Sequence, residues 1–219
     1  MGKISILHPE QKTILRLLGK ESALTNAYYF TGGTALSEVY LQHRESQDLD
    51  LFSKQPVDQK EITAIMTSLC ASKQLTLDVQ TVGPVLMCFL TYPTGYRLKI
   101  DFAHYPYPSI ESSHKTVSNF TVDSLRDIAT NKLLSITQRT EVKDFVDLYF
   151  LLQTYTFWDL RTAVEEKFHM DIDPLYVSSD YLKVEDFSFL PHMYKKFSLD
   201  ELKDFFRGEA VKLSSGSIA

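Results

Sequence analysis

The chain has 219 residues, enough to bury a substantial core in one large domain or in a small catalytic domain with an appended helical part. Its hydrophobic content of 44% and charged content of 23% are those of an ordinary globular protein. The net charge of −5 excludes general electrostatic binding of nucleic acid, so a contact with RNA or DNA would need a local basic patch.

The apolar pattern of the first half alternates between helix and strand periods. Taken in chain order, it predicts helix 9–24, strand 28–30, helix 34–42, strand 48–53, helix 59–73 and strands 75–81, 85–92 and 96–102. We expect Thr34 to cap the second of these helices, directly after a Gly-Gly turn. The first half therefore predicts a mixed α/β core.

The second half is predicted to be helical. After a loop over 105–113, we expect Asp123 to cap a helix that runs to about Arg139, followed by a helix over 142–154 and by aromatic-rich helices to about Phe206. These patterns divide the chain into an α/β core over residues 1–120, a helical part over 121–213 and a flexible tail over 214–219.

The cysteines and the N-terminal sequence favour a cytoplasmic protein. Cys70 and Cys88 lie in apolar runs without a CxxC motif, so we expect buried, reduced thiols. Residues 1–20 contain no apolar signal core, and no segment approaches the length of a membrane span. We therefore expect no contact with a membrane.

The segment over residues 31–52 combines a glycine turn with two acidic residues. Backbone N–H groups of Gly32 and Gly33 at the start of a helix can hold phosphate. Asp48 and Asp50 would lie on one face of a strand, where they repel each other unless a cation such as Mg²⁺ bridges them. Taken alone, each piece is equally compatible with a plain turn and a half-exposed acidic strand.

Asp101 adds a third candidate carboxylate. In the strand over 96–102 the apolar residues face one way, which leaves Arg97, Lys99 and Asp101 on the other face. If this strand neighbours the strand over 48–53, three carboxylates can converge on one or two Mg²⁺ ions that bind an NTP and activate a hydroxyl group. The alternative is an acid at the end of a strand, paired with Lys99.

Five further residues have both a functional and a structural interpretation. Arg44 and Ser46, between helix and strand, could contact phosphate or sugar, although a turn with a solvated arginine fits as well. Lys132 could contact the triphosphate, with Asp144 orienting a basic group or the acceptor. Spacing alone instead favours a solvated helix face that carries Asp144 and Asp147.

Three blocks of sequence have the order and spacing of a known family. They are Gly32-Gly33-Thr34-Ala35-Leu36 with Arg44-x-Ser46-x-Asp48-Leu49-Asp50-Leu51-Phe52, then Lys99-Ile100-Asp101-Phe102, then Asp127-Ile128-Ala129-x-x-Lys132-Leu133 with Arg139 and Lys143-Asp144-Phe145-Val146-Asp147-Leu148-Tyr149. The blocks resemble the AbiEii/AbiGii toxin family, part of the nucleotidyltransferase superfamily related to DNA polymerase beta. The resemblance covers nearly the whole chain, since Ser198–Phe206 also looks like the family's C-terminal helix.

The resemblance implies a nucleotidyltransferase-like mixed sheet flanked by helices, followed by a helical part that completes the active-site cleft. It implies site residues of four kinds: Asp48 and Asp50 as metal ligands, with Asp101 at the third carboxylate position; Gly32, Gly33 and Thr34 as triphosphate contacts; Lys132 as a nucleotide contact; and Asp144 as a further active-site acid.

The expected function is Mg²⁺-dependent transfer of NMP from an NTP to a hydroxyl acceptor, a reaction of EC 2.7.7 type. The resemblance implies the toxin of an AbiE-like toxin–antitoxin or phage-defence pair, with tRNA as one acceptor and a cognate antitoxin as a partner. Two alternatives stay open. One is a small-molecule transferase of the aminoglycoside-modifying kind, and the other is an inactive module of the same fold that binds a partner.

Overall fold

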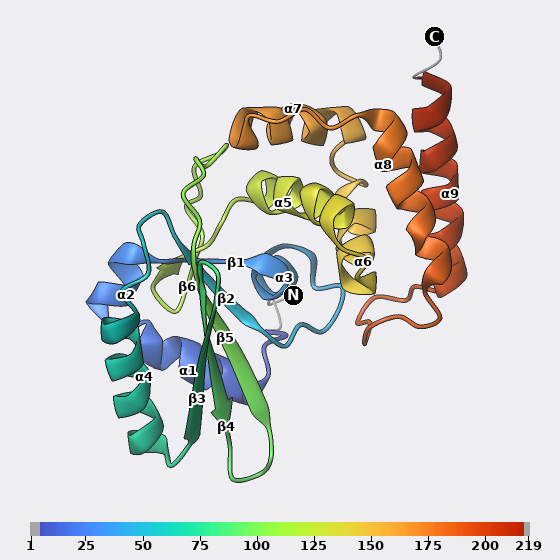
Figure 1. Ribbon diagram of the computed structural model, residues 1–219. Helices are drawn as coiled ribbons and strands as arrows, with labels where there is room; N and C mark the ends of the chain where they lie inside the picture. The colour runs from blue at the N-terminus through green and yellow to red at the C-terminus, as the bar shows by residue number, and fades with distance from the viewer. Residues whose placement is uncertain (1–4, 217–219) are drawn as a thin grey trace. The chain divides into compact units, whose positions relative to one another are not determined.

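The computed structural model describes residues 5–216 and forms two compact units, each assembled from several stretches of chain (Figure 1). The first unit contains the chain up to Tyr40, Glu45–Tyr107 and Ser113–Asp123. The second contains Leu41–Arg44, Pro108–Ser112 and the chain from Ser124 onward.

The first unit is built on a five-stranded mixed sheet with the order β1-β2-β5-β4-β3. The strands are β1 (Tyr29–Thr31), β2 (Leu49–Ser53), β3 (Thr76–Val82), β4 (Val85–Thr91) and β5 (Arg97–His104). β2 and β5 run parallel, whereas the other neighbours are antiparallel. A parallel pair needs a long crossover, which α4 (Gln59–Lys73) and the β3–β4 hairpin supply. The resulting register places Asp50 opposite Asp101.

The two faces of the central strands differ sharply. The face buried in the core carries Leu49, Leu51, Leu98, Ile100 and Phe102. The opposite face carries Asp50, Lys99 and Asp101, which are partly exposed. This alternation confirms the faces predicted from the sequence.

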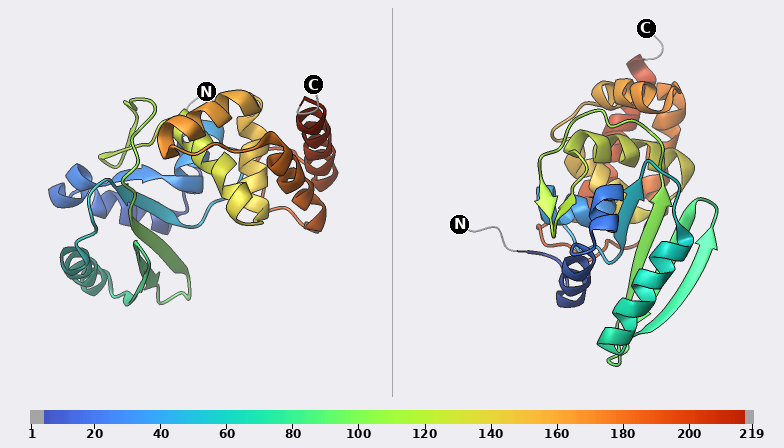
Figure 2. Two further views of the ribbon diagram at one scale, coloured as in Figure 1. Left: turned by 45° about the horizontal axis from the view of Figure 1, so that its top comes forward. Right: turned by 90° about the vertical axis from the view of Figure 1, so that its left-hand side faces the viewer.

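Helix α4 lies along β3 and β4 (Figure 2). Its buried residues are Ile62, Met66 and Cys70. Cys70 and Cys88 on β4 are buried free thiols, as predicted, and burial, the largest effect, raises the pKa of Cys88 to about 12. The helix therefore covers the sheet with apolar and thiol side chains.

The N-terminal part of the first unit differs from the prediction in detail. Two helices, α1 (Pro9–Leu18) and α2 (Ser22–Ala27), replace the single helix expected over 9–24. The break occurs at Gly19, where a Cβ would overlap the backbone of Ser118. A turn distant in sequence therefore packs against the end of α1, which helical periodicity cannot reveal.

The helix after the glycine turn is also irregular. It begins as α3 (Gly32–Ala35), with Thr31 rather than Thr34 at the N-cap position, and continues as a π-helix over Leu36–Leu41. A small ribbon of β6 (Thr116–Val117) and β7 (Phe120–Thr121) completes the first unit.

The second unit is helical. Its helices are α5 (Leu125–Gln138), α6 (Val142–Leu151), α7 (Phe157–Phe168), α8 (Pro174–Tyr181), a 3-10 helix (Leu182–Asp186) and α9 (Leu199–Gly216). Aromatic side chains join them: the ring centroid of Phe206 on α9 lies 5.2 Å from that of Phe145 and 5.0 Å from that of Tyr181. The segment Leu41–Arg44 joins this unit through a β-bridge between Arg44 and Met193.

Two predictions about the second half need correction. Ser124, not Asp123, caps α5, because its hydroxyl accepts the N–H of Asp127. Asp123 instead accepts a hydrogen bond of 2.9 Å from the hydroxyl of Thr31. α9 continues through Gly216, so the first residues of the expected frayed tail are helical, and residues 217–219 lie outside the described part.

The predicted fold class is confirmed as a mixed α/β fold with a five-stranded mixed sheet flanked by helices. Within residues 5–216, the structure contains no helix that is both long and apolar enough to cross a membrane.

The cap of α4 allows a test of the fold. The Asp58 carboxylate accepts the backbone N–H groups of Lys60 and Glu61, both at 3.0 Å. We expect Asp58→Ala to lower the free energy of unfolding by about 1 kcal/mol, because both N–H groups lose their acceptor. Urea denaturation followed by circular dichroism measures the change. Lys60→Ala removes an exposed side chain from the same turn and should cost less than about 0.5 kcal/mol, so equal losses would contradict the assignment.

Candidate active site

Three carboxylates and one ammonium group gather on the partly exposed face of β2 and β5. Asp50 and Asp101 are partners in the parallel register, and Asp48 directly precedes β2. The Nζ atom of Lys99 lies 2.6 Å from Oδ2 of Asp101 and 3.9 Å from Oδ2 of Asp48. The condition stated for the sequence, that the strand with Asp101 neighbours the strand with Asp50, is therefore met.

These charges influence one another strongly. Partial burial lowers the pKa of Lys99, but Asp101, Asp48 and Asp50 outweigh this effect and leave its pKa raised. Among residues 5–216, no group of three or more His, Cys, Asp or Glu side chains forms a preassembled metal site. The Lys99 ammonium nevertheless lies between carboxylates of β5 and of the residue directly before β2, at the position that a cation would take. Carboxylate oxygens are the ligands that Mg²⁺ prefers, so the donor set fits this ion.

Gly32 permits the approach of the glycine turn to this group. Its φ of +73° lies in the region that favours glycine, and an added Cβ would overlap the carboxylate of Asp50. The preceding residue, Thr31, is the register partner of Asp50 in β1 and β2. The Gly-Gly turn is thus held against the carboxylate by the sheet itself.

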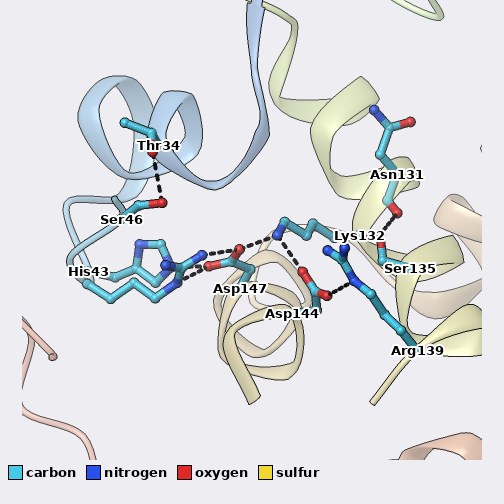
Figure 3. A network of polar contacts seen from close by, with 10 residues as sticks. Thr34, His43, Ser46, Asn131, Lys132, Ser135, Arg139, Asp144 and Asp147 are labelled. Atoms are coloured by element: carbon cyan, nitrogen blue, oxygen red, sulfur yellow. Dashed lines mark hydrogen bonds and ion pairs between the residues drawn. The ribbon is translucent and has the colours of Figure 1, made fainter. Parts of the chain in front are cut away.

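Thr34 and Gln11 hold the backbone from which Asp48 projects. The buried hydroxyl of Thr34 bonds to the Ser46 hydroxyl at 2.8 Å (Figure 3) and to the carbonyl of Asp48. The side-chain amide of Gln11 donates to the carbonyls of Ser46 and Gln47, both at 2.9 Å. Gln11 was not singled out from the sequence.

A cluster of ionic side chains lies in the second unit (Figure 3). Arg44 forms a bidentate pair with Asp147, with Nε–Oδ1 and Nη2–Oδ2 distances of 2.7 Å. Nε2 of His43 lies 2.8 Å from the same Oδ1 atom. Arg44 is only 3% exposed, so the interpretation as a solvated arginine is wrong.

Lys132 connects the two acidic residues of α6. Its Nζ atom lies 2.7 Å from Oδ1 of Asp144 and 2.6 Å from Oδ2 of Asp147. Nε of Arg139 pairs with the other oxygen of Asp144 at 2.7 Å. Both aspartates have 0% exposure, so the solvated helix face that spacing favoured is wrong. Their cationic partners from other segments offset the cost of burial, and helical spacing cannot show such partners.

The environment sets the charge of this ionic cluster. Burial raises the pKa of Asp147, but Arg44, Lys132 and His43 outweigh it and hold the pKa well below its usual range. Burial likewise lowers the pKa of Lys132, and Asp147 and Asp144 reverse this into a raised pKa. His43 has a lowered pKa, chiefly from burial, and is neutral at pH 7. The ionic cluster thus contains three cations and two carboxylates, an excess of positive charge that favours anions.

The structure brings the predicted site residues together in two groups. The first unit gathers Gly32, Gly33, Thr34, Ser46, Asp48, Asp50 and Asp101. The second unit gathers Arg44, Lys132 and Asp144. His43 and Asp147 belong to the second group and were not assigned a site role from the sequence.

The chain is similar to known proteins in sequence and in fold. A family model described as "Nucleotidyl transferase AbiEii toxin, Type IV TA system" matches residues 16–215. A curated relative, an uncharacterized protein of Aquifex aeolicus (strain VF5), is 33% identical over 141 residues, which is 63% of this chain and 63% of the relative. The aligned region therefore spans less than two thirds of that relative.

Two solved structures share the fold. MenT4, a nucleotidyltransferase toxin of Mycobacterium tuberculosis H37Rv, has a TM-score of 0.60 at 17% identity, covering 94% of this chain and 82% of its own. A proposed nucleotidyltransferase of H. pylori has a TM-score of 0.59 at 20% identity, covering 96% and 97%. The sheet and helices described above are thus those of known nucleotidyltransferase structures.

The glycine turn yields a prediction about Asp50. Gly32→Ala would combine a positive φ with a clash, and we expect it to lower the free energy of unfolding by roughly 1–3 kcal/mol more than Gly95→Ala. Gly95 is the matched control, because its φ is +87° and an added Cβ meets nothing within 4 Å. Chemical denaturation of both variants measures the difference. Equal losses would show that the carboxylate of Asp50 does not constrain residue 32.

The ionic cluster yields a prediction about pH. Asp147→Asn leaves Arg44 and Lys132 without their shared carboxylate, and we expect a loss of about 3–5 kcal/mol in unfolding free energy at pH 7. Because folding lowers the pKa of Asp147, its stabilisation is complete above its unfolded pKa of about 3.9 and disappears as the pH falls toward the folded value. The difference between the wild-type protein and the variant should therefore shrink below about pH 4.

The control for this measurement is Asp204→Asn. Asp204 forms an exposed ion pair with Arg207, with 2.6 Å between Oδ1 and Nη1. Loss of this ion pair should change the unfolding free energy by less than about 1 kcal/mol at pH 7. Urea denaturation from pH 3 to pH 8 compares the two variants. A loss for Asp147→Asn that does not vary with pH would contradict the argument.

Proposed function

The chain belongs to the AbiEii nucleotidyl transferase toxin family, and we propose that it is a Mg²⁺-dependent nucleotidyltransferase that moves NMP from an NTP to a hydroxyl acceptor. Pyrophosphate leaves in this reaction, which makes it one of EC 2.7.7 type. The observation that carries this proposal is the register of the parallel strands, which sets Asp50 opposite Asp101, with Asp48 directly before β2.

We assign metal binding to these three carboxylates. Bound Mg²⁺ supplies charge neutralisation of the triphosphate and a lowered pKa of the attacking hydroxyl group. Asp48, Asp50 and Asp101 would hold the ion, and Gly32 leaves room for the carboxylate of Asp50. Thr34 keeps the backbone at Asp48 in place through its hydrogen bond to the Asp48 carbonyl.

Phosphate recognition in the first unit is assigned to its glycine turn. The backbone N–H groups of Gly32, Gly33 and Thr34 open the helical segment of α3, where peptide dipoles favour an anion. The hydroxyl of Ser46, which shares a hydrogen bond with Thr34, would contact phosphate or sugar. Glycine lets the backbone approach the triphosphate closely.

The ionic cluster of the second unit is assigned to binding an anionic part of the substrates. Its excess of positive charge supports this role, with Lys132 and Arg44 as the proposed nucleotide contacts. Asp144 would orient the side chains of Lys132 and Arg139, to which it is ion-paired at 2.7 Å. Arg139, whose side chain is 53% exposed, is the cation in this cluster most open to solvent.

The biological role proposed is that of the toxin in an AbiE-like toxin–antitoxin or phage-defence pair. The family description supports a toxin, and tRNA is the acceptor that we propose to test first. A cognate antitoxin would then accompany it, and a neighbouring gene for a small winged-helix regulator would be the corresponding genetic observation.

The test is a transfer assay with each labelled NTP, with and without total tRNA, in Mg²⁺ or EDTA. We expect Asp48→Ala and Asp50→Ala to abolish both transfer and toxicity while the protein stays folded, because each removes a carboxylate from the proposed metal site. Asp78→Ala is the matched control, since Asp78 is an exposed acid of the same sheet that pairs with Arg97.

The outcomes separate the candidate functions. Label on tRNA supports the proposal, whereas label only on an added aminoglycoside indicates a small-molecule transferase. Wild-type protein that binds no NTP in the presence of Mg²⁺ indicates a partner-binding module. Full toxicity of the Asp48/Asp50 double variant would contradict the proposed chemistry.

A further inference from the structure

Lys99 lies beside the carboxylates of the acidic group on β2 and β5. Its ammonium contacts Oδ2 of Asp101 at 2.6 Å and approaches Oδ2 of Asp48 to 3.9 Å. Asp50, the register partner of Asp101, adds a third negative charge to its surroundings. A protein cation therefore already lies where the carboxylates converge.

We propose that Lys99 is a resident counter-ion that competes with the divalent ion for Asp48 and Asp101 and so sets the metal concentration at which the site loads. This inference rests on the proposed function of the same carboxylates. A divalent ion bound to these oxygens would lie within a few ångströms of the ammonium, where like charges repel. Loading must therefore move the Lys99 side chain away from its present partners.

Strand β5 fixes the backbone position of Lys99 and the face on which its side chain lies. Side chains alternate along β5, so Lys99 and Asp101 share one face at a separation of two residues. Residues on either side of Lys99, Leu98 and Ile100, are fully buried and anchor the backbone. Only the side chain of Lys99 is then left to move, and it is 29% exposed.

Arg97 shows that the position of Lys99 is specific. Arg97 lies on the same strand and the same face, yet its guanidinium packs over the ring of Phe89 at 4.2 Å and pairs with Asp78 at 3.6 Å. No ion pair joins it to Asp48 or Asp101 among the contacts of the described residues. The two cations of β5 thus differ in their partners, which makes Arg97 a control of equal charge.

The resident charge has a second consequence for the metal-free protein. Asp50 and Asp101 sit on neighbouring strands and repel each other when both are ionised. The Lys99 ammonium reduces this repulsion and favours pairing of β2 with β5 before metal binds. Removing the ammonium group should therefore lower the unfolding free energy of the metal-free protein. It should also enlarge the stabilisation that bound metal provides.

The experiment measures Mn²⁺ binding to the full chain by electron paramagnetic resonance, without any substrate. We expect Lys99→Met to lower the dissociation constant for Mn²⁺ by about tenfold, because one positive charge leaves the site. Lys99→Arg keeps the charge, and its dissociation constant for Mn²⁺ should lie within about threefold of the wild-type value. Arg97→Met should change the dissociation constant by less than about twofold.

Thermal unfolding in EDTA and in Mn²⁺ provides a second readout. Mn²⁺ should raise the melting temperature of Lys99→Met by more than it raises that of the wild type.

Each outcome supports or overturns the inference. Equal Mn²⁺ affinity of the wild type and Lys99→Met overturns it while leaving the metal site intact. Equal tightening by Lys99→Met and Arg97→Met also overturns it, since a general charge effect would then suffice. If neither the wild type nor any variant binds Mn²⁺, the proposed metal site is wrong, and the inference about Lys99 is overturned with it. If Lys99→Met does not fold, Lys99→Gln carries the same prediction.

Discussion

The parallel pairing of β2 with β5 is the constraint on which the acidic site depends. Its register sets Asp50 opposite Asp101, and the two-residue period of a strand brings Lys99 to the same face. A slip of one residue would turn these charges into the core and the leucines outward. The buried side chains of Leu49 and Ile100, which are partners in the same register, oppose such a slip. Apolar burial on one face thus determines the charge arrangement on the other.

In the second unit, the burial of paired charges determines how the ionic side chains are arranged. The Asp147 carboxylate contacts His43, Arg44 and Lys132. His43 and Arg44 lie 104 and 103 positions before it in sequence, whereas Lys132 comes from the preceding helix, α5. A buried ion set of this kind adds little net stability compared with an apolar core, but breaking it is costly because unpaired charges remain. The arrangement therefore holds these side chains in defined positions.

Some elements were predicted correctly from local signals, although the caps expected at Thr34 and Asp123 were wrong. The bounds of α4, residues 59–73, were predicted correctly because its apolar period and its Asp58 cap agree. The break at Gly19 was missed, since it depends on packing against Ser118 about 100 residues later. The solvated interpretation of Asp144 failed because its partners Lys132 and Arg139 lie outside α6, although the alternative that Asp144 orients a basic group fits these ion pairs.

Sites that violate local preferences are expected where function imposes them. The acidic group contains such conflicts: like charges face each other across two strands, and Gly32 adopts a positive φ against the carboxylate of Asp50. An apolar or neutral pair at these positions would stabilise the sheet without repulsion between like charges. The side chains of Gln11 and Thr34 donate hydrogen bonds to backbone carbonyl groups at residues 46–48, which do not belong to a helix or a strand ladder. These features have a common explanation if the carboxylates must be held ready for a cation, and the Lys99 ammonium, 2.6 Å from Asp101, offsets part of their repulsion.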